Sequence, residues 1–187
     1  MEKQDLKGCL TTLHQGGTIL YPTDTIWGLG CDATNPEAVD RLYTLKQRDQ
    51  NKPMIILLEN INQIMSYVDR PPKVALDVIE LSNEPLTVVF DKAKSLPHNL
   101  ISQDGSIAIR LVKKKSIAEL IRRFRKPIVS TSANIAGVPS AKSFEDISDT
   151  LKSRVDYVCK SHRDEYCRKR SAIIRIKQDG EIIFLRK

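Results

Sequence analysis

Apolar and polar residues alternate along the chain with two different periods. In residues 2–15 the apolar positions are three or four residues apart, which predicts an amphipathic helix. Asn35 and Pro36 are typical of a helix start, because asparagine is a favoured cap and proline fits the first helical position. Helical spacing or capping signals predict four further helices, at residues 36–45, 71–82, 116–124 and 143–151.

Short runs of apolar and β-branched residues separate these helices and predict strands. They occupy residues 18–22, 53–58, 86–90, 106–112 and 126–133. Two last runs within 170–185, separated by Asp179-Gly180, predict a β-hairpin. Because strands and helices interleave, we expect an α/β fold with a twisted sheet of parallel and antiparallel strands flanked by helices. Residues 1–187 are expected to form a single domain.

The composition shows that the chain has a net positive charge. The chain has 187 residues, of which 41% are hydrophobic, an ordinary value for a globular protein. Its net charge of +7 favours polyanionic partners such as nucleotides or RNA. No apolar run approaches the roughly 18 residues that a membrane span needs, and the N-terminal segment carries acidic residues, unlike a signal peptide. We therefore expect a cytoplasmic protein without a membrane partner.

The chain has four cysteines and no C-x-x-C pair, so free thiols are expected in a reducing compartment. Cys159, His162 and Cys167 lie within nine residues and could ligate zinc, although their spacing matches no common zinc motif. The expectation is that the protein has no metal site, with zinc at these three residues as the alternative.

Four polar clusters lie near predicted strand ends, where α/β proteins commonly bind ligands. Each also has a simple structural explanation: a tight turn, a solvated charged loop, a polar loop, or an arginine paired with a carboxylate. The motifs for a Walker phosphate loop, a Rossmann dinucleotide site and a serine hydrolase are absent. The clusters are residues 21–30 with Thr23, Asp24 and Thr25, the cationic stretch 45–58, the hydroxyl-rich stretch 128–140, and Arg110.

In this order along the chain, the clusters resemble the YrdC/Sua5 family. The resemblance covers about residues 8 to 186, and its K-x-R and S-x-N signatures match Lys46-x-Arg48 and Ser132-x-Asn134. The segments that carry it are GGTILYPTDTIWGLGCDATN, LYTLKQRDQNKPMIILL, EPLTVVF, DGSIAIRLV, KPIVSTSANIAGVPSAKSFEDI, SAIIRI and FLRK. The family implies a YrdC-like domain of the short type.

The resemblance implies a nucleotidyltransferase, a threonylcarbamoyl-AMP synthase that uses L-threonine, bicarbonate and ATP with Mg²⁺ and releases pyrophosphate. Its product would serve the modification of adenosine 37 in tRNA, through separate threonylcarbamoyl-transfer proteins. The carbamate made from threonine and bicarbonate is already anionic and needs no strong general base. Cations and hydroxyl donors can therefore supply most of the catalysis, by positioning and by stabilising charge.

The resemblance also implies roles for individual residues. Lys46 and Arg48 would be catalytic and would bind the nucleotide. The other implied nucleotide ligands are Lys52, Ser106, Ser132, Asn134, Ser140 and Arg186. The residues implied at the threonine and bicarbonate end are Thr23, Arg110, Ser130 and Ser171. The chain departs from the family pattern at Trp27, where tyrosine is usual, at Ala172 and Arg175, and at its close, where R-P-G is reduced to Arg186-Lys187.

Two alternatives stay open. The first is a paralogue that binds RNA, including double-stranded RNA, without synthase activity, through the basic runs 113–115, 122–126 and 167–170. The second is a carbamoyl-transfer module like that of hydrogenase maturation proteins. The K-x-R and S-x-N pairs favour the enzyme over the first, because an RNA platform would need neither. The lack of acylphosphatase, zinc-finger and kinase-like domains argues against the second.

Overall fold

The computed structural model describes residues 1–52, 54–166 and 170–186. Within these ranges the strands form one nine-stranded sheet, in the order β7-β1-β2-β6-β3-β5-β4-β8-β9. Three neighbouring pairs are parallel (β7-β1, β3-β5 and β4-β8) and the others are antiparallel, so the expected mixed sheet is confirmed. The strands are β1 (Ile19–Pro22), β2 (Trp27–Asp32), β3 (Ile55–Leu58), β4 (Leu86–Phe90), β5 (Ile107–Leu111), β6 (Ile128–Ser132), β7 (Tyr157–Val158), β8 (Ala172–Ile176) and β9 (Ile182–Arg186).

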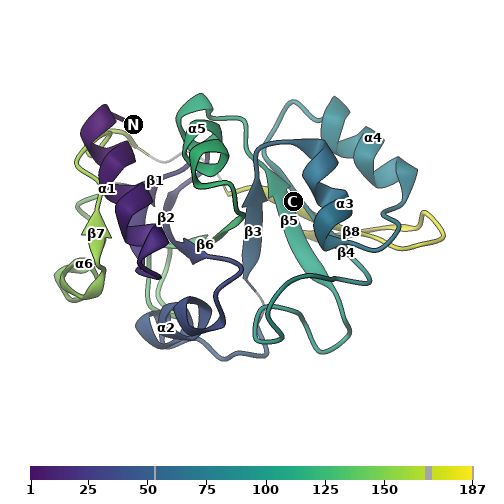
Figure 1. Ribbon diagram of the computed structural model, residues 1–187, viewed down its shortest axis with the longest axis horizontal. Helices are drawn as coiled ribbons and strands as arrows, with labels where there is room; N and C mark the ends of the chain where they lie inside the picture. Colours follow the sequence, from purple (N-terminus) through teal and green to yellow (C-terminus); the bar gives the residue numbers. More distant parts are fainter. Residues whose placement is uncertain (53, 167–169, 187) are drawn as a thin grey trace.

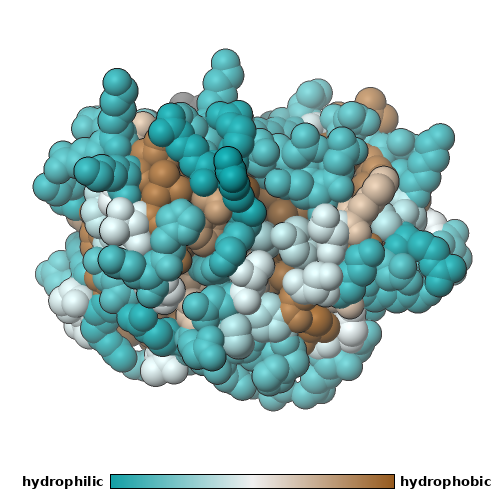
Figure 2. All heavy atoms as spheres, viewed as in Figure 1, coloured by the Kyte–Doolittle hydropathy of each residue, from teal (hydrophilic) through white to brown (hydrophobic). Residues whose placement is uncertain are grey.

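Helices flank the sheet, as expected for an α/β fold. They are α1 (Lys3–His14), α2 (Pro36–Lys46), α3 (Ile64–Tyr67) after the 3₁₀ turn η1 (Ile61–Gln63), α4 (Lys73–Leu81), α5 (Lys115–Phe124) and α6 (Asp149–Arg154). Figure 1 shows α1, α5, α3 and α4 in a row along one side of the sheet, with α2 at its lower end. This side of the molecule is covered mostly by hydrophilic residues (Figure 2). In the described ranges, no helix has the length and apolarity to cross a membrane.

Strand register separates an apolar face of the sheet from a second face, the polar face, which carries polar side chains among apolar ones. Residues that pair directly share a face, and successive residues of a strand alternate between faces. One row of paired residues across five strands is apolar and fully buried: Cys31, Val129, Ile56, Ile109 and Val88. One position along, the opposite face carries polar side chains in the middle of the strands. Among them are Thr87, Arg110 and Ser130, which line a cavity.

The expected helices and strands with clear periodicity are present, and Asn35 caps α2 by accepting a hydrogen bond from Ala38 N at 3.0 Å. Four of the described elements were not predicted: β2, β7, α3 and the 3₁₀ turn η1. The predicted helix at 143–151 is wrong over residues 143–148, since α6 begins at Asp149 after the Ser148 cap. There the Asp146 carboxylate accepts hydrogen bonds from the main-chain N–H groups of residues 142 and 143 and closes a turn instead.

Candidate active site

The cavity on the polar face is lined by cations and hydroxyl groups. None of the described lining residues is Asp or Glu, and four are arginines: Arg48, Arg110, Arg170 and Arg186. The hydroxyl residues are Thr23, Thr25, Thr87, Ser130, Thr131, Ser132 and Ser171. Burial, followed by the charges of Arg170 and Arg110, lowers the pKa of Arg186. A wall with several positive charges and hydroxyl donors is suited to binding anions.

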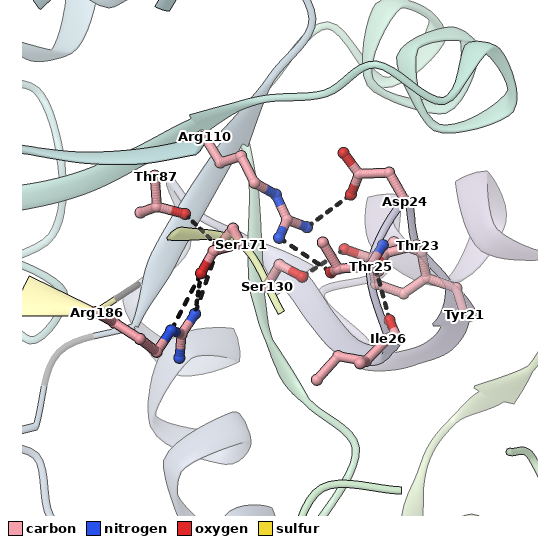
Figure 3. Close-up of polar contacts among 10 residues, drawn as sticks. All are labelled: Tyr21, Thr23, Asp24, Thr25, Ile26, Thr87, Arg110, Ser130, Ser171 and Arg186. Atoms are coloured by element: carbon pink, nitrogen blue, oxygen red, sulfur yellow. Dashed lines mark hydrogen bonds and ion pairs between the residues drawn. The ribbon is translucent and has the colours of Figure 1, made fainter. Parts of the chain in front are cut away.

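Arg110, the next-to-last residue of β5, is held by the turn that follows β1. Its Nη2 atom lies 3.0 Å from Asp24 Oδ1, and its Nη1 donates a hydrogen bond to Thr25 Oγ1 at 3.1 Å (Figure 3). The Arg110 and Asp24 side chains are only 5% and 7% exposed. Arg110 Nε and Asp24 Oδ2 are buried and have no hydrogen-bond partner within the described chain. Arg110 therefore pairs with a carboxylate and also lines the cavity. The structural explanation, an ion pair, and the functional one, a site residue, are both compatible with its position.

Thr23 shapes the turn that carries Asp24 and Thr25. Its Oγ1 accepts a hydrogen bond from Thr25 N at 3.0 Å and donates one to Ile26 O at 2.6 Å. Since a carbonyl oxygen can only accept, the Thr23 hydroxyl proton is committed to this turn. Gly28 packs behind it, where a Cβ atom would lie 2.9 Å from Thr23 Cγ2. Thr23 thus lines the cavity and holds the shape of its wall.

Tyr21 and Arg186 set the hydrogen bonds of the two site serines. Tyr21 Oη donates to Ser130 Oγ at 3.0 Å, and burial raises the pKa of Tyr21, so the phenol stays protonated. Ser130 keeps its own proton for a ligand. Arg186 donates from Nε and Nη2 to Ser171 O, at 3.1 and 2.8 Å, which fixes the end of β9 beside β8. Tyr21 was not predicted as a site residue, because its role depends on a partner 109 positions away.

Lys46, the last residue of α2, is buried although it carries a charge. Only 1% of it is exposed, and its Nζ donates to Ser132 O at 2.5 Å and Asn134 O at 2.6 Å. Its own carbonyl accepts from Ala136 N at 2.9 Å. Burial, followed by the charges of Arg48 and Arg170, lowers the pKa of Lys46 to about 7. Lys46 therefore fastens the S-x-N loop to the end of α2.

A groove continues from the cavity and shares Arg48, Ser132 and Arg170 with it. It brings the K-x-R and S-x-N pairs together, and Lys52, Gly137 and Val138 also line it. Asn134 Nδ2 donates to Val138 O at 2.6 Å and closes the loop between them. Its Oδ1 atom is buried and has no hydrogen-bond partner in the described parts of the chain. Arg48 Nε donates to Lys52 O at 2.8 Å, which shapes the cationic stretch.

Of three further residues, the predicted ligands Ser140 and Ser106 and the atypical Arg175, only Ser140 lies beside the groove. Ser140 Oγ accepts a hydrogen bond from Arg170 Nη2 at 2.5 Å, which ties it to the rim of the groove. Ser106 donates to Asp104 Oδ1 at 2.6 Å and lies outside the linings of the cavity and the groove. Arg175, atypical for the family, pairs with Asp91 at 2.5 Å and Asp104 at 2.7 Å. The structure thus brings Ser140 to the site but not Ser106.

Trp27 lies away from the cavity, whereas Arg170 lies at it. Trp27 is 1% exposed and its ring packs against Phe144, with centroids 4.9 Å apart, rather than lining the cavity. Arg170 was predicted only as part of a basic run, yet it lines both the cavity and the groove. The rest of that run, residues 167–169, lies outside the described residues. No periodicity or motif marks Arg170, because its position depends on the fold.

The candidate zinc ligands Cys159 and His162 have different surroundings. Cys159 Sγ lies 3.4 Å from Cys9 Sγ in the buried core. His162 contacts the N-terminal amine at 2.9 Å and Glu165 at 2.6 Å. Cys167 falls outside the described residues. Among the residues that the structure describes, no three metal-ligating side chains come together.

The fold and the site together define an α/β protein with a cavity lined by arginines and hydroxyl groups on the polar face of a mixed sheet. The chain belongs to the Sua5/YciO/YrdC family, since that family model, described as "Telomere recombination", matches residues 11–187. It is 34% identical over 159 residues to a threonylcarbamoyl-AMP synthase of Pseudoalteromonas translucida (strain TAC 125), covering 83% of this chain and 85% of that protein. A protein of the same name from Blochmanniella pennsylvanica (strain BPEN) is 32% identical over 185 residues, covering 96% and 92%.

The fold also matches a solved structure of the family. The crystal structure of P. abyssi Sua5 complexed with L-threonine superimposes with a TM-score of 0.83 at 24% identity. The match covers 94% of this chain and 52% of that one, so this chain spans about half the length of that Sua5 protein. At this identity the similarity establishes the fold.

Proposed function

We propose that the protein is a threonylcarbamoyl-AMP synthase that makes threonylcarbamoyl-AMP and pyrophosphate from L-threonine, bicarbonate and ATP. Relatives with this name align over most of their own length at 32% and 34% identity. The observation that carries the proposal is the meeting of Lys46-x-Arg48 and Ser132-x-Asn134 in a groove that opens into the arginine-lined cavity. An RNA-binding platform would need neither pair.

The cavity and the groove divide the substrates between them. We assign threonine and bicarbonate to the cavity, with Thr23, Arg110, Ser130 and Ser171 in its wall. The nucleotide is assigned mainly to the groove, with Lys46, Arg48, Lys52, Ser132 and Asn134. Ser140 borders this end through its bond to Arg170, whereas Arg186 lines the cavity beside Ser171, and Ser106 has no contact that supports its assignment. Because the two spaces share Arg48, Ser132 and Arg170, the carbamate and the α-phosphate would meet beside these residues.

The chemistry needs little proton transfer from the protein. The neutral amine of threonine attacks the carbon of bicarbonate and water leaves, which gives a carbamate anion. A carbamate oxygen then attacks the α-phosphorus, the new O–P bond forms, and pyrophosphate leaves with the electrons of the broken bond. The arginines stabilise the charge that moves onto pyrophosphate, and the fixed hydroxyl groups orient the two anions.

Arg48 and Lys46 would serve this reaction differently. Arg48 lines both spaces, so its charge lies where the transferred group passes. Lys46 lies behind the S-x-N loop, where its ammonium holds two carbonyl groups and adds a positive charge. The described lining of the cavity has no carboxylate and that of the groove has one, Asp49, which is too few ligands for a preformed Mg²⁺ site, so the ion is expected to arrive on the triphosphate. The product would pass to tRNA through separate transfer proteins in the cytoplasm.

Mass spectrometry after incubation with threonine, bicarbonate, MgATP and pyrophosphatase tests the proposal. We expect threonylcarbamoyl-AMP that depends on all three substrates and a loss of at least about 100-fold in Arg48→Ala. Arg122→Ala is the matched control, because Arg122 is exposed on α5, away from the cavity and the groove. A folded wild-type protein that forms no product but binds double-stranded RNA tightly would support the RNA-binding alternative instead.

A further inference from the structure

Thr87, in β4, lines the cavity beside two predicted site residues, Arg110 and Ser171. It pairs directly with Arg110 of β5 on one side and with Ile173 of β8 on the other. Thr87 is completely buried, yet it is one of the residues that line the cavity. Directly paired residues of antiparallel strands have Cβ atoms about 5 Å apart, and both Thr87 and Arg110 line the cavity.

The Thr87 hydroxyl forms a pair with Ser171 that leaves one proton unused. Their Oγ atoms are 2.8 Å apart, and neither hydroxyl donates to any other group in the described chain. Each hydroxyl has one proton, and the bond between them uses only one. Because both side chains are buried and buried donors are normally satisfied, the second proton points to a partner in the cavity.

Arg186 also donates to this pair. Its Nη2 atom lies 3.4 Å from Ser171 Oγ, and a guanidinium can only donate (Figure 3). Ser171 Oγ has two lone pairs, so it can accept from Arg186 whether it donates to Thr87 or accepts from Thr87. When Ser171 donates to Thr87, the Thr87 proton is left for a ligand, and when Thr87 donates to Ser171, the Ser171 proton is left.

We infer that Thr87 is a substrate-binding residue that, together with Arg110, binds a planar carboxylate-type anion in the cavity. This inference rests on the proposed function, in which two such anions are available: the α-carboxylate of threonine and bicarbonate. Arginine beside a hydroxyl donor suits such a group, because a carboxylate accepts several hydrogen bonds at fixed angles. Arg110 Nε, which has no hydrogen-bond partner in the described chain, adds a donor on the same residue.

Steady-state kinetics of Thr87→Val and Thr87→Ser test this inference. Valine keeps the shape and strand propensity but removes the hydroxyl, whereas serine keeps the hydroxyl. We expect Thr87→Val to raise the KM for threonine or for bicarbonate about 10- to 100-fold, as for a lost hydrogen bond to a charged group, and to leave the KM for ATP within about 2-fold. Thr87→Ser is expected to recover most of the affinity. The substrate whose KM rises identifies the anion.

Thr12→Val is the matched control, since Thr12 is a buried threonine of α1 that does not line the cavity. Calorimetric titration of L-threonine and of bicarbonate into each protein separates this inference from the proposed function. Anion binding that needs the Thr87 hydroxyl supports the inference even if the wild type forms no adenylate. Wild-type affinities and KM values in Thr87→Val, or no binding of either anion to the wild type, overturn it. If Thr87→Val does not fold, Thr87→Cys, with its weak S–H donor, is expected to show the same losses.

Discussion

The guanidinium of Arg110 and the carboxylate of Asp24 lie 3.0 Å apart, and both side chains are almost completely withdrawn from water. The pair joins β5 to the turn after β1, which are 86 positions apart in the chain. Withdrawing two charges from water costs free energy, which their mutual attraction offsets only while both are present. The ion pair thus orients the Arg110 guanidinium in the cavity. The conformation of the turn that carries Asp24 depends in turn on Arg110.

Removing one member of this pair is expected to be more harmful than removing both. Arg110→Met leaves the Asp24 carboxylate buried and unpaired, and should lower the free energy of unfolding by about 3–5 kcal/mol. Asp24→Asn combined with Arg110→Met should recover at least about 1 kcal/mol of this loss. Urea unfolding of the wild type, both single variants and the double variant measures the coupling. Additive losses would show that the two side chains do not interact.

Lys46 gives the protein a stability that depends on pH. Burial lowers its pKa from 10.5 to about 7, so between these values the unfolded chain holds a proton that the folded protein has released. This group therefore makes the folded state more stable as the pH rises from about 7 to 10. The free energy of unfolding of the wild type should rise over this range relative to Lys46→Met. Lys73→Met, at the exposed start of α4, should follow the wild type. A difference between wild type and Lys46→Met that is constant with pH would contradict the prediction.

The sequence predicted the elements whose apolar residues recur regularly, and it grouped most of the candidate site. The strong periodicity of α1, α2 and α5 and the apolar runs of β3 to β6 needed no tertiary information. The sequence did not predict β2, because Gly28 and Gly30 are unfavourable in strands. At Gly30 a Cβ atom would lie 2.7 Å from Val129 O, so the close approach of β6 requires glycine there. The same glycine made β2 look unlike a strand in the sequence.

The hydrogen bonds of the site could not be predicted from the sequence. Thr87 and Ser171 are 84 positions apart, and Lys46 and Ser132 are 86 apart, so their contacts depend on strand register. Lys46 was predicted to face the nucleotide, but the charge pattern could not show that its ammonium is held by two carbonyl groups. Arg175 departs from the family pattern, and its two carboxylate partners, which are distant in sequence, explain how the fold tolerates it.

Gly28 is expected to be needed for the shape of the cavity wall. Alanine there would place Cβ 2.9 Å from Thr23 Cγ2 and 3.2 Å from Ser130 Oγ, which forces one of them to move. Gly28→Ala should lower kcat/KM for threonine at least about 10-fold and cost about 1–3 kcal/mol of stability. Thr23→Ser removes the obstructing methyl and keeps the hydroxyl bonds, so it should restore part of the loss in the double variant. Equal kcat/KM in Gly28→Ala and the double variant would locate the obstruction elsewhere.

Asn134 is expected to serve the nucleotide rather than threonine. Its Nδ2 atom closes the loop onto Val138 O, and its buried Oδ1 atom is left facing a site where a ligand can donate a hydrogen bond. Asn134→Ala removes both functions and should raise the KM for ATP about 10-fold, the cost of roughly 1.4 kcal/mol of lost binding, while the KM for threonine changes less than about 2-fold. Asn134→Asp keeps the oxygen but cannot donate to Val138 O, so it should also weaken ATP binding. Asn62→Ala, at an exposed position with no site contact, is the control. Kinetics with each substrate varied in turn measure these constants, and an effect on threonine alone would place Asn134 at the other end of the site.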